Sequence, residues 1–219
     1  EIIQTNQVLE NLDVEYSFLD YFQAMSYLYK LDYEKANKYF LSYLNHYKGK
    51  SYIKSSYQKL AWISYLQNDS ANMNIYLEKV LYKGDQINDV DKVALRQAKQ
   101  RNFSHPYLLK SRLLYDGGYY SLALSELNQI RSSAFFSASY TQIEYWYRLA
   151  RIESKLNNSD SVIISYYKKV LEIGKNSTSY YAPMSALQIG LIYEKEKDFD
   201  QARYYFKKCL TMSGFDYQN

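Results

Sequence analysis

Residues 186–209 read ALQIGLIYEKEKDFDQARYYFKKC and contain the clearest periodic pattern of the chain. Apolar side chains recur every three or four residues on both sides of a polar turn, which predicts two amphipathic helices. In the first helix the small residue Gly190 precedes Tyr193 by one turn, and in the second Ala202 precedes Phe206 in the same way. Because a small residue lets a neighbouring helix approach closely, the stretch predicts a helix–turn–helix pair.

The same order of small and aromatic residues recurs along the chain, and it is the pattern of a tetratricopeptide repeat. Repetition of one motif in a fixed order favours a helical-repeat array, although alanines and aromatics at helical spacing also occur in ordinary bundles. The upstream units are marked by Ala24, Tyr27, Tyr33, Ala36 and Phe40; Tyr57, Leu60, Ala61, Met73, Leu77 and Val80; Tyr107, Ser111, Leu114, Gly118, Tyr120, Ala123, Leu127 and Ile130; and Trp146, Leu149, Ala150, Ile163, Tyr167 and Val170. The sequence therefore predicts an all-α fold, a right-handed α-solenoid of about five such repeats.

The repeats are expected at residues 17–48, 54–84, 105–131, 142–174 and 182–213, within a single domain over 1–219. The step from Met73 to Ala123 is longer than the roughly 34 residues of a standard repeat. We therefore expect an inserted helix at about 88–100. Residues 1–15 are expected to form an opening helix or the second helix of a missing unit.

The composition agrees with long helices. Glycine and proline number 7 and 2, too few for the many tight turns of a β-sandwich or barrel. Tyrosine, with 28 copies, is abundant. This abundance has two interpretations, the codon bias of an AT-rich genome or an adhesive aromatic surface, since tyrosine supplies contact area at low entropic cost.

Charge and hydropathy disfavour a nucleic-acid partner and a membrane span. The net charge is +4 and the basic residues form no run, so a nucleic-acid partner is not favoured. No apolar stretch reaches the roughly 18 residues of a membrane span. The sequence begins at Glu1 without a methionine or signal sequence, so we expect a processed protein or a fragment that lacks any targeting segment. The compartment, cytoplasm or periplasm, stays open.

Several strings resemble the tetratricopeptide repeat protein 39 or yeast inclusion-body-clearance family. They are GKSYIK (49–54), QKLAW (58–62), DK (91–92), LLKSRLLYDGGYY (108–120) and YRLAR (147–151), and the resemblance extends from about residue 20 to the end. The composition is similar to that of Bacteroidetes proteins, which suggests a distant bacterial relative. The resemblance implies a helical-repeat scaffold with no catalytic residues and supplies no ligand.

No residue pattern indicates catalysis or a cofactor. The two histidines, His46 and His105, are far apart in the sequence, and Cys209 falls at a buried core position. Gly117 and Gly118 form a turn and lack the Lys-Ser/Thr pair of a phosphate-binding loop. We therefore expect a chain that is not an enzyme and binds no metal or cofactor.

A partner is expected on the first helices of the repeats, which line a concave groove in tetratricopeptide arrays. The repeat register assigns to this groove Tyr21, Met25, Tyr29, Gln58, Trp62, Tyr65, Arg112, Tyr115, Tyr147, Arg151 and Lys155. Exposed aromatics beside arginines are typical of interface hot spots. Arg112 and Arg151 share one repeat position and could together bind a carboxylate. The alternative is that both pair internally, with Asp116 and Glu144.

The sequence thus predicts a protein-interaction scaffold that binds a peptide or protein segment with acidic residues. A carbohydrate-binding helical domain is one alternative, but it would need long inserted loops, and residues 85–104 are too short and too helical. A structural module that forms homo-oligomers through its terminal repeats is another.

Overall fold

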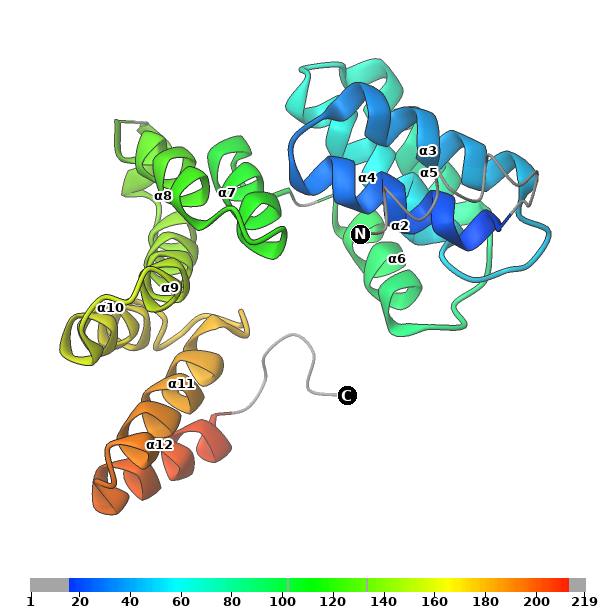
Figure 1. The fold of residues 1–219 in the computed structure, drawn as a ribbon. Helices are drawn as coiled ribbons and strands as arrows, with labels where there is room; N and C mark the ends of the chain where they lie inside the picture. The colour runs from blue at the N-terminus through cyan, green and yellow to red at the C-terminus, as the bar shows by residue number, and fades with distance from the viewer. Residues whose placement is uncertain (1–15, 102, 133, 213–219) are drawn as a thin grey trace. The chain divides into compact units, whose positions relative to one another are not determined.

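The computed structural model describes residues 16–101, 103–132 and 134–212, and these are helical with no strand (Figure 1). The chain divides into two compact units, Glu1–Pro106 and Tyr107–Asn219. The first unit contains α2 (Ser17–Tyr29), α3 (Tyr33–His46), α4 (Ile53–Leu66), α5 (Ser70–Tyr82) and α6 (Asp89–Gln100). The second contains α7 (Pro106–Asp116), α8 (Tyr120–Gln129), η1 (Ile130–Ser132), η2 (Ala134–Ser137), α9 (Ser139–Lys155), α10 (Asp160–Ile173), α11 (Tyr181–Lys195) and α12 (Phe199–Thr211).

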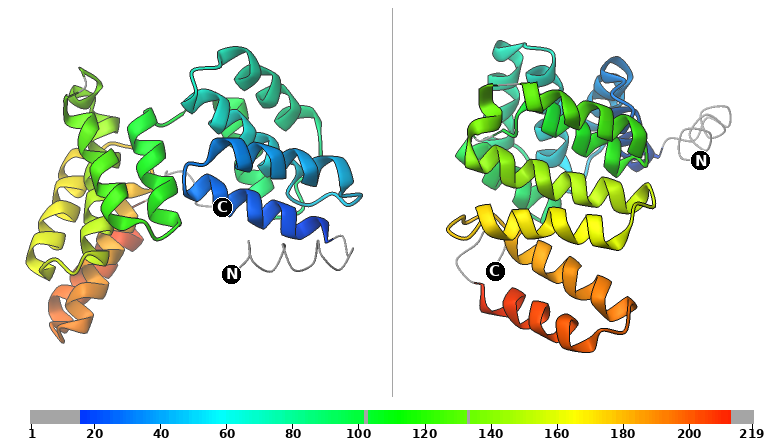
Figure 2. Two further views of the ribbon diagram at one scale, coloured as in Figure 1. Left: turned by 45° about the horizontal axis from the view of Figure 1, so that its top comes forward. Right: turned by 90° about the vertical axis from the view of Figure 1, so that its left-hand side faces the viewer.

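Consecutive helices pack as pairs in both units. The pairs α2–α3, α4–α5, α9–α10 and α11–α12 are in extensive contact. The hydroxyl of Ser111 on α7 donates to the Ala123 carbonyl of α8 at 2.8 Å. Figure 2 shows the helices of the second unit following one another as successive layers. The all-α helical-repeat class and the extra helix, α6, are confirmed, whereas the expectation for residues 1–15 lies outside the described residues.

The turns within the pairs share one backbone geometry, which the sequence search did not use. Each contains one residue with a left-handed φ of 60–83°, namely Leu31, Asn68, Gly118, Asn157 and Lys197. In each, the next residue's N–H donates to the carbonyl five positions earlier, at 2.8–3.1 Å. These bonds satisfy carbonyls that the end of the first helix leaves unpaired. The five turns are therefore copies of one motif, as a repeat requires.

Three of these turns also cap the second helix. Asp32, Asp69 and Asp198 each precede such a helix, and each side chain accepts the backbone N–H three residues later. A carboxylate at this position satisfies a free amide and interacts favourably with the positive end of the helix dipole. A left-handed residue followed by aspartate thus ends one helix and starts the next.

The small residues permit the close helix contact that the sequence predicts. A Cβ atom at Gly190 would lie 2.5 Å from the ring of Phe206, so α11 and α12 meet at this glycine. Ala202 of the same helix pair is also buried. Ala36 and Ala123, the small residues of the second helix in two other pairs, are buried as well. The contact depends on the absence of a side chain at position 190.

We expect Gly190→Val to destabilise the second unit by about 1–3 kcal/mol, because the added carbons overlap the ring of Phe206 in a packed contact. Urea unfolding followed by circular dichroism measures the loss. The control is Leu191→Val, which changes the neighbouring residue, 42% exposed on the same helix. Equal stability of Gly190→Val and wild type would show that the two helices do not meet here.

The first helical turn of α4 is held by α6. The fully buried carboxylate of Asp91 accepts the backbone N–H groups of Tyr52 and Ser55 at 2.7 and 2.9 Å. Tyr52, the N-cap of α4, makes no capping bond with its own side chain. Nearby, the buried Lys54 amine donates to the carbonyls of Val80 and Leu81 at the end of α5. Asp91 of α6 therefore satisfies N–H groups at the start of α4, and Lys54 of α4 satisfies carbonyl groups at the end of α5.

We expect Asp91→Asn to cost about 1–3 kcal/mol, because the amide loses the charge and turns an N–H₂ group toward a buried backbone N–H. Thermal unfolding of the full chain measures the cost. Asp89→Asn is the matched control on the same helix, because the Asp89 side chain is 93% exposed. A similar small effect of both substitutions would contradict the capping role.

Candidate partner-binding face

The predicted groove is closed along α4. Gln58 donates to Gln97 of α6 at 2.5 Å, and the ring of Tyr65 stacks on Phe103 at 5.0 Å. Trp62, which lies between Gln58 and Tyr65 on α4, is 5% exposed. The expectation of an exposed aromatic at Trp62 is therefore wrong. The inserted helix and the residues after it cover the side of α4 that the repeat register assigned to a partner.

Along α2 the groove residues are also largely internal. Tyr21 is buried and its hydroxyl lies 2.9 Å from the Ser55 hydroxyl of α4, while Met25 and Tyr29 are half-buried. Burial raises the pKa of Tyr21 well above its usual value. Together with the closed side of α4, this leaves little open surface on the first unit at the predicted positions.

In the second unit, α7 and α9 bring four predicted residues together. We call Arg112, Tyr115, Arg151 and Lys155 the arginine–tyrosine face. The first three are half-buried and Lys155 is exposed. The fifth predicted residue, Tyr147, is buried, and its ring centroid lies 5.0 Å from that of Tyr181. Burial raises the pKa of Tyr147, so its hydroxyl stays protonated near neutral pH.

Arg151 is held by rings rather than by a carboxylate. Its guanidinium carbon lies 4.2 Å from the Tyr115 ring centroid and 5.8 Å from that of Tyr147. Among the described residues no ion pair involves Arg151. A planar guanidinium over an aromatic face keeps its N–H fork available for an anion.

The neighbouring arginines are paired. The Arg112 side chain lies 3.7 Å from the Asp116 carboxylate one turn away, as the internal-pairing alternative predicts. Glu144 pairs with Arg148, whose Nε donates to Glu144 Oε1 at 2.8 Å, and both residues are buried. The other half of that alternative, Glu144 with Arg151, is therefore wrong. The spacing of one turn between Glu144 and Arg148 could have indicated the observed pair.

The arginines surround a small recess. Its walls are Ser111, Arg112, Tyr115, Arg148, Arg151 and Ile152. Three guanidinium groups lie here, of which Arg112 is paired with Asp116 and Arg148 with Glu144. These residues pack closely, and the space between them is too small to hold a water molecule.

The residues considered for catalysis have ordinary surroundings. The His46 ring lies 3.3 Å from the Ser42 hydroxyl, and burial lowers the pKa of His105. Burial raises the pKa of the Cys209 thiol, which leaves it protonated and a weak nucleophile. The part of the chain that the structure describes holds no cluster of metal-ligating side chains. No helix within those residues is long and apolar enough to span a membrane.

The C-terminal helix pair matches the model of a known repeat family. Residues 185–211 match the family model of the tetratricopeptide repeat. This match covers most of α11 and all of α12, the pair that meets at Gly190. A comparison with curated proteins finds no match. The match supports a protein of the tetratricopeptide-repeat type, and the finer resemblance to the protein 39 family stays a prediction.

Proposed function

We propose that this chain is a non-enzymatic scaffold whose arginine–tyrosine face binds a peptide segment with acidic residues. Tetratricopeptide repeats generally mediate protein–protein interactions. The observation that carries the proposal is Arg151, a half-buried guanidinium held between two tyrosine rings and paired with no carboxylate of the described residues.

The chemistry of the face favours a carboxylate over other ligands. A guanidinium presents parallel N–H groups that match the two oxygens of a carboxylate, and partial burial strengthens that bond. Tyr115 and Arg112 beside it add aromatic and hydrogen-bonding surface, the composition of an interface centre. Lys155, one turn beyond Arg151 on α9, extends the positive charge along the helix.

The test is selection of random twelve-residue peptides on the immobilised full chain. We expect the enriched peptides to contain aspartate or glutamate. The variant with Arg112→Glu and Arg151→Glu should bind a selected peptide at least tenfold more weakly, about 1.4 kcal/mol or more. Calorimetric titration measures the affinities, and circular dichroism checks that the variant is folded.

Arg203→Glu is the matched control, because it makes the same charge change at an exposed residue of α12, outside the face. It should bind like wild type. If no acidic peptide is enriched, or if the double variant binds as tightly as wild type, the proposed face is not the binding surface.

A further inference from the structure

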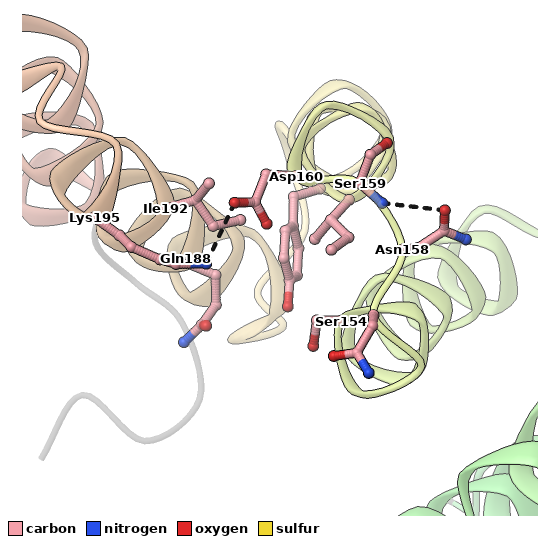
Figure 3. Close-up of a pocket in the computed structure, with 10 residues that line it drawn as sticks. Ser154, Asn158, Ser159, Asp160, Gln188, Ile192 and Lys195 are labelled. Carbon is pink, nitrogen blue, oxygen red and sulfur yellow. Dashed lines mark hydrogen bonds and ion pairs between the residues drawn. The ribbon is translucent and has the colours of Figure 1, made fainter.

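A second recess in the same unit lies where α9 ends and α10 begins. It is an open pocket of about 470 Å³, bounded by the last turn of α9, the α9–α10 turn and one side of α11 (Figure 3). Ser154, Asn158 and Ser159 lie on one side of the view and Gln188, Ile192 and Lys195 on the other. The volume falls within the range of small-ligand pockets and exceeds that of a single side chain.

Three polar groups of this pocket lack a hydrogen-bond partner in the described protein. They are the hydroxyl of Tyr167 and the side-chain amides of Asn157 and Gln188, all of which line the pocket. Tyr167 is only 2% exposed. The Tyr167 hydroxyl is not one of the buried polar atoms that lack a partner, so it is open to the pocket, where a polar group of a ligand can bond to it.

The charges of the pocket cancel. Lys195 Nζ lies 3.5 Å from the Asp160 carboxylate, and these two are its only ionisable lining groups apart from Tyr167 (Figure 3). Such a lining disfavours a phosphate or another strongly charged ligand. The amides of Asn157 and Gln188 each offer a donor and an acceptor, which matches the N–H and C=O of a peptide group.

A sugar also carries many hydroxyl groups, but sugar rings are commonly stacked on open aromatic faces. Tyr167 is the one aromatic residue among the lining residues, and its ring is buried. The pocket therefore fits the polar main chain of a peptide better than it fits a sugar ring.

The pocket adjoins the arginine–tyrosine face. Ser154 lines the pocket and donates its hydroxyl to the backbone carbonyl of Arg151, at 2.7 Å. The Tyr167 ring centroid lies 6.1 Å from that of Tyr147, which in turn contacts Arg151. A peptide held at Arg151 can therefore continue along α9 into the pocket.

We infer that the pocket binds two or three residues of an extended peptide through their main-chain amide groups, with Asn157, Tyr167 and Gln188 as the bonding side chains. The inference rests on the proposed function, since it continues the peptide bound at Arg151. The arginine–tyrosine face would then select the acidic side chain of the peptide, and the pocket would bind the extended main chain next to it.

The experiment uses a peptide selected on the full chain and a series of its derivatives, each N-methylated at one backbone nitrogen. In wild type, methylation at one to three consecutive positions should weaken binding at least tenfold, because it removes a donor from the pocket. In the variant Asn157→Ala with Gln188→Ala, the same methylations should change affinity less than twofold, since the partners are already absent. Gln201→Ala, an exposed amide on α12, is the matched control.

Tyr167→Phe separates binding from folding. It removes a hydroxyl without a partner in the described protein, so the variant should be as stable as wild type or more stable while it binds the peptide several-fold more weakly. A loss of stability instead would assign Tyr167 a structural role and contradict its place in the site.

The outcomes distinguish this inference from the proposed function. If peptide binding depends on Arg112 and Arg151 but is unchanged in the pocket variants, the pocket assignment alone is overturned. Failure to enrich any peptide overturns both. Binding on a glycan array that the Asn157 and Gln188 changes abolish would assign the pocket to a sugar and overturn the peptide inference.

Discussion

The folded chain is expected to unfold cooperatively as the pH rises above about 10, the usual pKa of tyrosine. Among the described residues six tyrosines are buried: Tyr21, Tyr43, Tyr145, Tyr147, Tyr167 and Tyr205. Burial raises the pKa of each, because a phenolate loses its hydration in the core. The folded chain thus keeps these protons at a pH at which the unfolded chain releases them.

The sign follows from proton linkage. A raised folded-state pKa contributes stability that is fully present below the unfolded pKa and is lost as the pH rises toward the folded pKa. Each such tyrosine costs about 1.4 kcal/mol per pH unit above 10. Burial raises the pKa of Tyr21, Tyr43 and Tyr167 far above 10, so these three together reduce the stability by roughly 4 kcal/mol per pH unit, a large part of the whole stability of a typical domain.

The measurement is a pH titration followed by two signals, far-ultraviolet circular dichroism for helicity and ultraviolet absorbance for phenolate. The phenolate of the six buried tyrosines should appear together with the loss of helix. Full ionisation of all tyrosines near pH 10 with helicity retained would contradict the burial described above.

The helical-repeat fold could be predicted because its determinants are local. The spacing of Gly190 and Tyr193, and of Ala202 and Phe206, is visible within one short window of sequence. It predicts two helices in close contact, and Gly190 and Phe206 form that contact. In three of the five turns the left-handed residue and the capping aspartate are also neighbours in the sequence. Local patterns of this kind depend on no distant part of the chain.

The surface of α4 could not be predicted in the same way. The repeat register assigns Gln58 and Trp62 to an open groove, but a register describes a standard array without an inserted helix. Here α6 contacts α4, and Asp91 fixes it there by binding backbone groups 36 and 39 positions away in sequence. No pattern within α4 itself indicates that contact.

The ion pairs show a related limit. Arg112 and Arg151 occupy one repeat position, yet Arg112 lies near Asp116 whereas Arg151 lies on tyrosine rings. The position in the repeat specifies the direction in which a side chain points. The residue one helical turn away then determines whether that side chain forms an ion pair. Glu144 pairs with Arg148, one turn later in the helix. Arg151 therefore lies over the ring of Tyr115 and not beside Glu144.

Glu144→Leu is expected to destabilise the second unit by about 3–5 kcal/mol, because it leaves the guanidinium of Arg148 buried without a counter-ion. Arg148 is 5% exposed, and among the described residues its side chain donates hydrogen bonds to Glu144 alone. Arginine cannot shed its charge at ordinary pH, so the penalty is not relieved by deprotonation. Chemical unfolding with urea measures the loss, and Glu78→Leu, which breaks the exposed pair with Arg101, should cost at most about 1 kcal/mol.

The double variant, Glu144→Leu with Arg148→Met, decides what the buried pair contributes. Replacing both charges by apolar groups of similar volume removes the unpaired charge as well as the attraction, so its stability should return close to that of wild type or exceed it. A strongly favourable coupling between the two single changes in the mutant cycle would confirm that the damage comes from the unpaired arginine. If the double variant is as unstable as Glu144→Leu, Glu144 stabilises the core around Tyr147 and Tyr181 by its packing rather than by its charge.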